Sequence, residues 1–323
     1  MMRLQSAVLL AFNFIDIASA HSWVEQLVNV APNGSFVGEY GYPRNFTDKG
    51  IAPFDQESMK WMLPPLGQQP PFITPDNLLC HPSQHDPEQS PDYPRLQVAP
   101  GSIIAIRYAE NGHATLPGGG TGLSGKPEKG GTVFVFGTTD PSREETLHDV
   151  LNWNGSDGSN QRLLLTAQNF DDERCYQLGD QSPLAKSRRE RFPNPVPGQP
   201  GSNFEIFCET DVQLPRQMEA GKPYTLYWVW QWPTAPGKDA NFPGGRDEYY
   251  TSCIDVDVVE GLVPAQPLHP LRQQDPIPTA VSDFRSRAAI TSSPLALHSM
   301  PGFGPVHATE RRAGPGKGEF TAA

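Results

Sequence analysis

Short apolar or alternating runs, separated by clusters of proline and glycine, dominate the chain between residues 21 and 260. Runs of this kind predict β-strands, and several of them joined by turn residues predict an antiparallel β-sandwich. No long stretch repeats its apolar residues with a helical period, so we expect an all-β fold of the immunoglobulin or fibronectin III kind, with long loops. The clearest runs are 23–30 (WVEQLVNV), 102–108 (SIIAIRY), 132–137 (TVFVFG), 162–167 (RLLLTA), 224–232 (YTLYWVWQW) and 253–259 (CIDVDVV).

Two of these runs show the alternation most clearly. In the run 253–259, we expect the isoleucine and valines to face the core and Asp255 and Asp257 to face water. In the run 224–232, every second residue shares one face, and we predict that this face is core rather than a ligand surface, because aromatic side chains bury the largest areas. The residues of that face are Tyr224, Leu226, Trp228, Trp230 and Trp232.

The first twenty residues have the three parts of a secretory signal peptide. Arg3 supplies the basic start, an apolar run extends over 7–17, and small residues end the segment. The apolar run is too short to span a bilayer, which makes an uncleaved membrane anchor the weaker alternative. We therefore expect residues 1–20 to be removed, His21 to begin the mature protein, and the protein to be extracellular.

Composition changes again near residue 261. Residues 261–323 are rich in proline, serine, glycine and arginine and have no apolar period. Such a segment cannot bury enough surface to offset the entropy of ordering it. We expect one β-sandwich domain over 21–260 and a disordered tail over 261–323.

Net charge bears on the binding partner of the protein, and the cysteines bear on its disulfides. The net charge of −11 at pH 7 argues against nucleic acid, which is bound through lysine and arginine, and is compatible with a neutral polysaccharide. Four cysteines in a secreted chain predict two disulfides, with three pairings possible. We expect a monomer. The cysteines are Cys80, Cys175, Cys208 and Cys253.

Long connections separate the predicted strands, notably 34–77 and the proline-rich stretch 178–202. Loops of this length in a compact domain are usually functional or disordered. In the first of them, Tyr40 and Tyr42 are either exposed and able to stack on sugar rings or packed in a local hydrophobic cluster. Glycosylation sequons at Asn33, Asn45 and Asn154 agree with a secretory route.

A histidine at a mature amino terminus offers two metal ligands, its α-amino nitrogen and its ring Nδ1. One further imidazole would complete a planar set of three nitrogens, an arrangement that suits Cu(II). Among the histidines of the folded region, His113 follows a predicted strand and precedes a glycine-rich loop, where a ligand can be held rigidly. His81 and His85 are spaced as helical metal ligands are, but neighbouring prolines make a helix doubtful, and we expect no metal there.

Three separated stretches resemble the framework of the fungal lytic polysaccharide monooxygenases, copper enzymes whose metal is held by a histidine brace. They are HSWVEQL, then DNLLCHPSQ followed by LQVAPGSIIAIRYAENGHATLP, and finally GRDEYYTSCIDVDVV. In the cellulose-active fungal family, a similar Asp-x-x-Cys-His stretch precedes the strand that delivers the second brace histidine. A late Gln-Phe-Tyr-x-Ser-Cys stretch delivers an axial tyrosine and a disulfide cysteine. The resemblance lies in the order of the motifs.

The resemblance implies a role for each matching residue. His21 and His113 would hold one copper ion, and Tyr250 would occupy the axial position. Glu248 would position an oxygen ligand by hydrogen bonding. Glu248 stands where the cellulose-active family has glutamine, although related families use glutamate. The chain is therefore similar to a divergent branch rather than to that family itself.

The same resemblance implies a disulfide between Cys80 and Cys253, which leaves Cys175 to pair with Cys208. It also implies that the copper, with an external electron donor and with hydrogen peroxide or dioxygen, cleaves glycosidic bonds in cellulose, hemicellulose or chitin.

Two other hypotheses stay open. One is a secreted histidine-brace protein that binds copper without cleaving polysaccharide, with a role in copper handling or the cell wall. The other is a carbohydrate-binding module with an incidental histidine. Hydrolysis is disfavoured, because there is no Gly-x-Ser-x-Gly elbow and carboxylate pairs such as Asp171 and Asp172 are interpreted as solvated loop residues.

Overall fold

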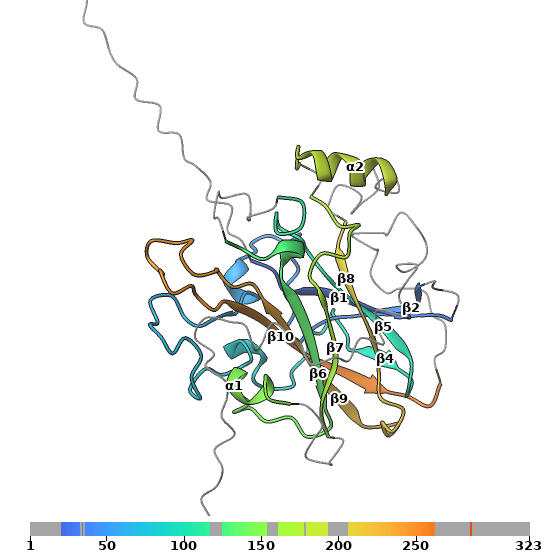
Figure 1. The fold of residues 1–323 in the computed structure, drawn as a ribbon. Helices are drawn as coiled ribbons and strands as arrows, with labels where there is room; N and C mark the ends of the chain where they lie inside the picture. The colour runs from blue at the N-terminus through green and yellow to red at the C-terminus, as the bar shows by residue number, and fades with distance from the viewer. Residues whose placement is uncertain are drawn as a thin grey trace, which may run out of the picture.

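The protein is a sandwich of two β-sheets, seen in a computed structural model (Figure 1). The all-β prediction is therefore confirmed. The expected signal segment, residues 1–20, lies outside the described residues, as does all of the expected tail except Gly261 and Arg285. The structure describes residues 21–32, 34, 36–116, 125–153, 161–177, 179–192, 206–261 and 285.

The smaller sheet has four strands in the order β2–β1–β5–β8, all paired antiparallel. Strand β1 begins three residues after His21, and β5 ends just before the loop that carries His113. Because β1 and β5 are neighbours, the start of the first strand and the end of the other lie side by side. The strands are β1 (Val24–Val30), β2 (Phe36–Gly41), β5 (Ile103–Tyr108) and β8 (Cys208–Gln213).

The larger sheet has six strands. Five follow the order β3–β10–β9–β6–β7 in antiparallel pairs, and β4 pairs with β10 in parallel. Strand β10 therefore has neighbours on both edges. Tyr250, near the beginning of β10, pairs with Trp230, near the end of β9. The strands are β3 (Met62–Leu63), β4 (Leu96–Val98), β6 (Thr132–Thr138), β7 (Arg162–Asn169), β9 (Pro223–Gln231) and β10 (Tyr249–Val258).

The main core fills the space between the sheets. It contains every second residue of 224–232, so the prediction that this aromatic face is core is confirmed. The opposite face of the same strand is also buried, with Tyr227 and Val229 packed under the loops and the short helix α1 (Leu147–Val150). Both faces of β9 are therefore covered, and its continuous apolar sequence is explained.

The alternation predicted for the last strand is only partly right. Asp255 was expected to face water, but it is 2% exposed and forms a two-bonded ion pair with Arg44, with both N–O distances 2.8 Å. The loop between β2 and β3 brings Arg44 across the outer face of the sheet, where its backbone nitrogen also donates to the carbonyl of Cys253. A strand pattern cannot show that a distant loop covers a face.

The stretch 178–202, expected to be an irregular connection, contains the helix α2 (Pro183–Arg191). Ser182 caps it by accepting a hydrogen bond from the backbone nitrogen of Ala185, Pro183 occupies its first turn, and three arginines lie in its last turn. In Figure 1, α2 lies at one end of the molecule and α1 lies near the other. Single-turn 3-10 helices occur at η1 (Gln56–Ser58), η2 (Pro82–Gln84) and η3 (Glu128–Gly130).

Over the part of the chain that the structure describes, no helix has the length and apolar character that crossing a membrane requires.

Candidate metal centre

His21 lies at the entrance to β1 and is fixed on both sides of its ring. Its Nδ1 is 3.4 Å from the hydroxyl oxygen of Tyr250, and its Nε2 is 3.3 Å from Nζ of Lys60. Its carbonyl oxygen accepts a hydrogen bond from the side-chain amide of Asn111. The start of the domain is therefore tied to β10 and to the loop after β5.

His113 lies on a tight turn that Glu110 organises. The buried Glu110 carboxylate accepts hydrogen bonds from the backbone nitrogens of Ala114 at 3.0 Å and Thr115 at 3.2 Å, and from the Thr115 hydroxyl at 2.8 Å. It also accepts from the backbone nitrogen of Gln177 at 3.1 Å. Burial raises the pKa of Glu110, although these hydrogen bonds oppose the shift. The turn is thus held from within, which gives His113 a fixed direction.

Aromatic side chains enclose the His113 ring, which belongs to a residue only 4% exposed. Its centroid lies 4.2 Å from that of Trp232, 4.6 Å from that of Trp230 and 5.9 Å from that of Phe170, in edge-to-face contacts. Within the described residues, neither ring nitrogen has a hydrogen-bond partner. A buried polar atom without a partner costs about 1–3 kcal/mol, so two such atoms on one ring require an explanation.

The electrostatic surroundings keep His113 neutral. Its pKa is held well below the usual 6.5, first by burial and then by the positive charges of Lys126 and His21. Ring contacts join the two histidines, because Trp230 contacts both His113 and Tyr250, and Tyr250 contacts His21. A neutral imidazole with an available lone pair is the form that binds metals.

Tyr250 completes this group of side chains. It is 1% exposed, its ring stacks on Trp230 with centroids 4.9 Å apart, and its hydroxyl donates to Oε1 of Glu248 at 2.6 Å. Burial and the nearby Glu248 carboxylate raise its pKa well above 10, so it remains a protonated phenol. The structure thus brings together His21, His113, Tyr250 and Glu248, all selected from the sequence.

Lys126 is a member of the group that the sequence gave no reason to select. Its side chain is 3% exposed and lies over the Trp232 ring, with Nζ 3.7 Å from the ring centroid. Nζ donates to Oε2 of Glu248 and to the Trp232 carbonyl oxygen, both at 3.0 Å. A lysine in a glycine-rich stretch carries no pattern that distinguishes it from a solvated one, so this position could not be recognised in advance.

Two glycines that follow Lys126 allow the chain to pass close to the aromatic residues. Gly130 and Gly131 have φ values of 68° and 84°, in the left-handed region that favours glycine. A Cβ atom on Gly131 would lie 2.2 Å from the carbonyl oxygen of Gln231. Any residue other than glycine would therefore clash with the backbone there. The carbonyl oxygen of Gly130 accepts the indole proton of Trp230 at 2.7 Å, so the segment also anchors the wall behind His113.

The donor set suits copper. Two imidazoles and a phenol, joined by an α-amino nitrogen if the chain is processed before His21, are the nitrogen-rich ligands that copper prefers. One unpartnered nitrogen of His113 is explained if it serves as a ligand, and the other then carries the ring proton. The residues present therefore fit a copper ion.

The two tyrosines considered for sugar stacking do not form an exposed face. Tyr40 is 8% and Tyr42 6% exposed, and both pack in the cluster that covers the outer face of β1 and β5. Tyr42 contacts Phe46 and Tyr93 through its ring, which corrects the idea of a stacking platform in favour of the local hydrophobic cluster.

Of the three sequons, Asn33 and Asn154 lie outside the described residues. The side-chain nitrogen of Asn45, which glycosylation would modify, donates to the carbonyl oxygen of Ser83 at 2.5 Å.

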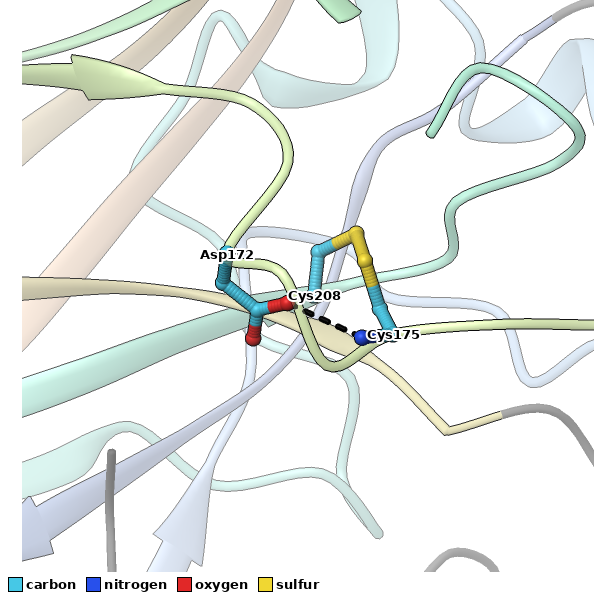
Figure 2. Close-up of side chains that lie close together, drawn as sticks. All are labelled: Asp172, Cys175 and Cys208. Carbon is cyan, nitrogen blue, oxygen red and sulfur yellow. Dashed lines mark hydrogen bonds between the residues drawn. A yellow bond between two sulfur atoms is a disulfide. The ribbon is translucent and has the colours of Figure 1, made fainter. Parts of the chain in front are cut away.

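Both implied disulfides are present, Cys80–Cys253 and Cys175–Cys208. Figure 2 shows that Asp172 lies beside the second of them, which makes a cluster of three potential metal ligands. The two sulfurs are bonded to each other, however, and Oδ1 of Asp172 accepts from the backbone nitrogens of Arg174 and Cys175, both at 2.9 Å.

This cluster therefore offers no thiolate to a metal. Asp171 and Asp172, expected to be solvated, are 5% and 4% exposed, because Asp171 pairs with Arg188 of α2 at 2.8 Å and Asp172 caps the loop.

Comparison with known proteins gives one family and several distant structures. No curated protein matches the chain. CvAA9A has 13% identity and a TM-score of 0.34 over 76% of this chain and 82% of its own. A cellulose-active polysaccharide monooxygenase from M. thermophila (MtPMO3*) has 14% identity and a TM-score of 0.29 over 80% and 86%, respectively. HiLPMO9B has 12% identity and a TM-score of 0.28 over 84% and 91%.

Similarities this low carry no argument about the site. The family model described as a domain of unknown function (DUF7492) matches residues 18–277, and the chain belongs to that family.

Proposed function

We propose that this protein, once cut before His21, is a secreted copper protein that cleaves a neutral polysaccharide oxidatively. The observation that carries the proposal is the buried His113 ring, which has both nitrogens unpartnered among the described residues. Trp230 connects this ring to Tyr250, whose hydroxyl oxygen is 3.4 Å from Nδ1 of His21. The order of the three sequence motifs supports the same site.

In this proposal His21 would hold copper through its α-amino nitrogen and ring Nδ1, and His113 would hold it through its ring. Tyr250, whose hydroxyl oxygen is 3.4 Å from Nδ1 of His21, would be the third residue beside the ion. Bound copper would supply one-electron redox chemistry, with electrons from an external donor and with hydrogen peroxide or dioxygen as the oxidising co-substrate. Copper must displace a proton from the α-amino group, whose usual pKa is about 7.7 to 8.0, so binding weakens in acid.

The residues of the chain have separate tasks around that ion. Trp230, Trp232 and Phe170 exclude water from the His113 ring and keep it neutral. Glu248 accepts a hydrogen bond from the Tyr250 hydroxyl and so keeps the phenol in place. The low exposure of all these groups favours fixed ligand directions, which a redox centre needs in order to limit reorganisation.

A neutral polymer is the substrate that fits the charge of the protein. The net charge of −11 would repel a polyanion, whereas cellulose, hemicellulose and chitin carry little or no charge.

A second candidate is a copper-binding protein that does not cleave polysaccharide. One observation favours it: within the described ranges, no phenylalanine, tyrosine or tryptophan side chain is exposed, and the exposed large apolar residues are Ile51, Leu66 and Leu184. Sugar rings commonly bind to proteins by stacking on exposed aromatic rings.

The test of the copper site compares mature protein that begins at His21 with a form that carries one additional residue before it. We expect a type-2 Cu(II) electron paramagnetic resonance spectrum in the first and its loss in the second, because the additional residue removes the α-amino ligand. Identical spectra and identical calorimetric affinities in the two forms would rule out the brace.

The test of the reaction incubates the copper-loaded mature protein with a reductant and with cellulose, hemicellulose or chitin. Oxidised oligosaccharides found by mass spectrometry would support cleavage. Their absence across the panel, together with intact copper binding, would favour the second candidate.

A further inference from the structure

Lys126 is almost fully buried beside the candidate metal centre, although the protein has ample surface for lysines. Its side chain is 3% exposed and that of its partner Glu248 10%. Burial lowers the pKa of Lys126, and the Glu248 carboxylate opposes this shift. A buried ion pair is weak evidence for a gain in stability, because the cost of desolvating both charges can exceed their attraction. The pair therefore calls for another role.

The two oxygens of Glu248 have different donors. Oε2 accepts from Lys126 at 3.0 Å, and Oε1 accepts from the Tyr250 hydroxyl at 2.6 Å. A carboxylate bonded at both oxygens cannot rotate without breaking one bond. Lys126 therefore determines the direction in which Glu248 accepts the phenol proton.

The chain of contacts continues from Tyr250 to the histidine. The phenol oxygen lies 3.4 Å from Nδ1 of His21, the atom proposed to bind copper. Its proton is directed away, towards Glu248. The position and orientation of this hydroxyl thus depend on Lys126, which reaches the centre from a loop between β5 and β6.

Lys126 is also held independently of Glu248. Nζ donates to the Trp232 carbonyl oxygen and lies over the Trp232 ring, whose centroid is 4.2 Å from that of His113. Cation–π contacts with tryptophan are the strongest of their kind. The lysine thus links the wall around His113 to the Glu248–Tyr250 pair.

We propose that Lys126 is a positioning residue of the metal centre, which acts through Glu248 to fix the Tyr250 hydroxyl beside His21. The role rests on the proposed copper site, but the geometry it predicts exists without metal. Removing a residue that hydrogen-bonds to a metal ligand commonly lowers metal affinity by about 10- to 100-fold.

The experiment replaces Lys126 with methionine, which keeps the apolar stem over Trp232 and removes the donor. The control is Lys222→Met, because the Lys222 side chain is 70% exposed and precedes β9 at the other end of the strand from Trp232. Lys126→Arg tests for rescue, since it restores a cationic donor.

The first readout uses metal-free protein. In crystal structures of the wild type and Lys222→Met, we expect the Tyr250 hydroxyl to stay bonded to Glu248. In Lys126→Met, we expect the carboxylate to turn towards water and this bond to be lost. An unchanged bond in the Lys126→Met structure would overturn the proposal, whatever the protein does with copper.

The second readout uses copper-loaded mature protein. We expect Lys126→Met to alter the Cu(II) resonance parameters and to weaken copper binding about tenfold, and Lys126→Arg to recover much of both. Wild-type protein without copper binding would refute the proposed function and leave the first readout to decide the role of Lys126. Wild-type parameters in copper-loaded Lys126→Met would overturn the positioning role.

If Lys126→Met does not fold, Glu248→Gln provides the same test. An amide offers one acceptor oxygen, which cannot serve Lys126 and Tyr250 from opposite sides. We expect a changed Cu(II) spectrum in this variant. An unaltered spectrum would overturn the proposal.

Discussion

Among the described residues, two clusters of potential metal ligands can be compared, and they differ in what their atoms are already bonded to. In the cluster of Asp172, Cys175 and Cys208, the sulfurs form a disulfide and Oδ1 of the carboxylate caps the loop. In the candidate metal centre, both ring nitrogens of His113 lack a partner within the described part of the chain. Oδ2 of Asp172 is also buried without a partner, but one carboxylate oxygen beside a disulfide is not a ligand set. Proximity of ligand atoms therefore does not make a metal site when the sulfurs are bonded to each other, whereas the candidate metal centre keeps a buried neutral imidazole.

The first prediction removes the imidazole of His113, and with it the lone pair available to a metal. We expect His113→Ala to lower copper affinity more than about 100-fold, beyond the range of groups that only support a ligand. Isothermal calorimetry on protein that begins at His21 would measure the change. His148→Ala is the matched control, because the His148 side chain is 38% exposed on α1 and should leave affinity unchanged. Equal affinity in His113→Ala and wild type would remove His113 from the site.

The second prediction breaks the closed cluster. The Cys175–Cys208 bond spans 33 residues, and its loss should destabilise the protein by about 4 kcal/mol in the chain-entropy picture. Denaturant unfolding of Cys175→Ser/Cys208→Ser would measure this. We expect the folded variant to keep the Cu(II) spectrum of the wild type, since the cluster supplies no ligand. A spectrum that changes in the folded variant would show that the two clusters are not independent.

The third prediction concerns a second buried carboxylate that, like Asp172, has one oxygen without a hydrogen-bond partner among the described residues. Asp247 is 1% exposed, its Oδ1 has no partner among the described residues, and burial raises its pKa to about 7. Between pH of about 4 and about 7 the folded state therefore binds a proton that the unfolded state has lost. This term lowers the free energy of unfolding as pH rises through that window.

Asp247→Asn should remove this decrease in the free energy of unfolding with rising pH. The rise in the pKa of Asp247 corresponds to at most about 4 kcal/mol in the free energy of unfolding. We expect about 2 kcal/mol, because the surrounding protein rearranges around the ionised carboxylate and reduces its cost. Thermal unfolding at pH 5 and pH 8 would show a smaller difference in Asp247→Asn than in wild type. Asp257→Asn, with a side chain 49% exposed, controls for the loss of a carboxyl group. Equal pH dependence in Asp247→Asn and wild type would contradict the assignment.

Six of the ten described strands could be predicted because their information is local, whereas the shorter or more polar strands β2, β3, β4 and β8 were not singled out. Every run singled out in the sequence is a strand in the structure, and the alternating face of β9 is in the core. The errors arose where distant parts of the chain meet. Asp255 is buried because a loop brings Arg44 to it, and Tyr40 and Tyr42 are buried because the same long connection folds over the outer face of the smaller sheet.

The candidate site divides in the same way. His113 could be selected because it follows a strand, and Tyr250 because it lies in a recognisable motif. Lys126 could not, since its burial depends on Trp232 and Glu248, which are more than a hundred residues away. Helix α2 had a local signal in Ser182 and Pro183, which the proline-rich composition around it obscured.

The contact between His21 and Tyr250 joins residues 229 positions apart, at the two ends of the folded domain. During synthesis this contact cannot form until residue 250 has left the ribosome, so a chain that ends before Tyr250 lacks it. If the centre binds copper as proposed, a nascent molecule has no Tyr250 beside His21, which would confine reactive copper chemistry to finished protein.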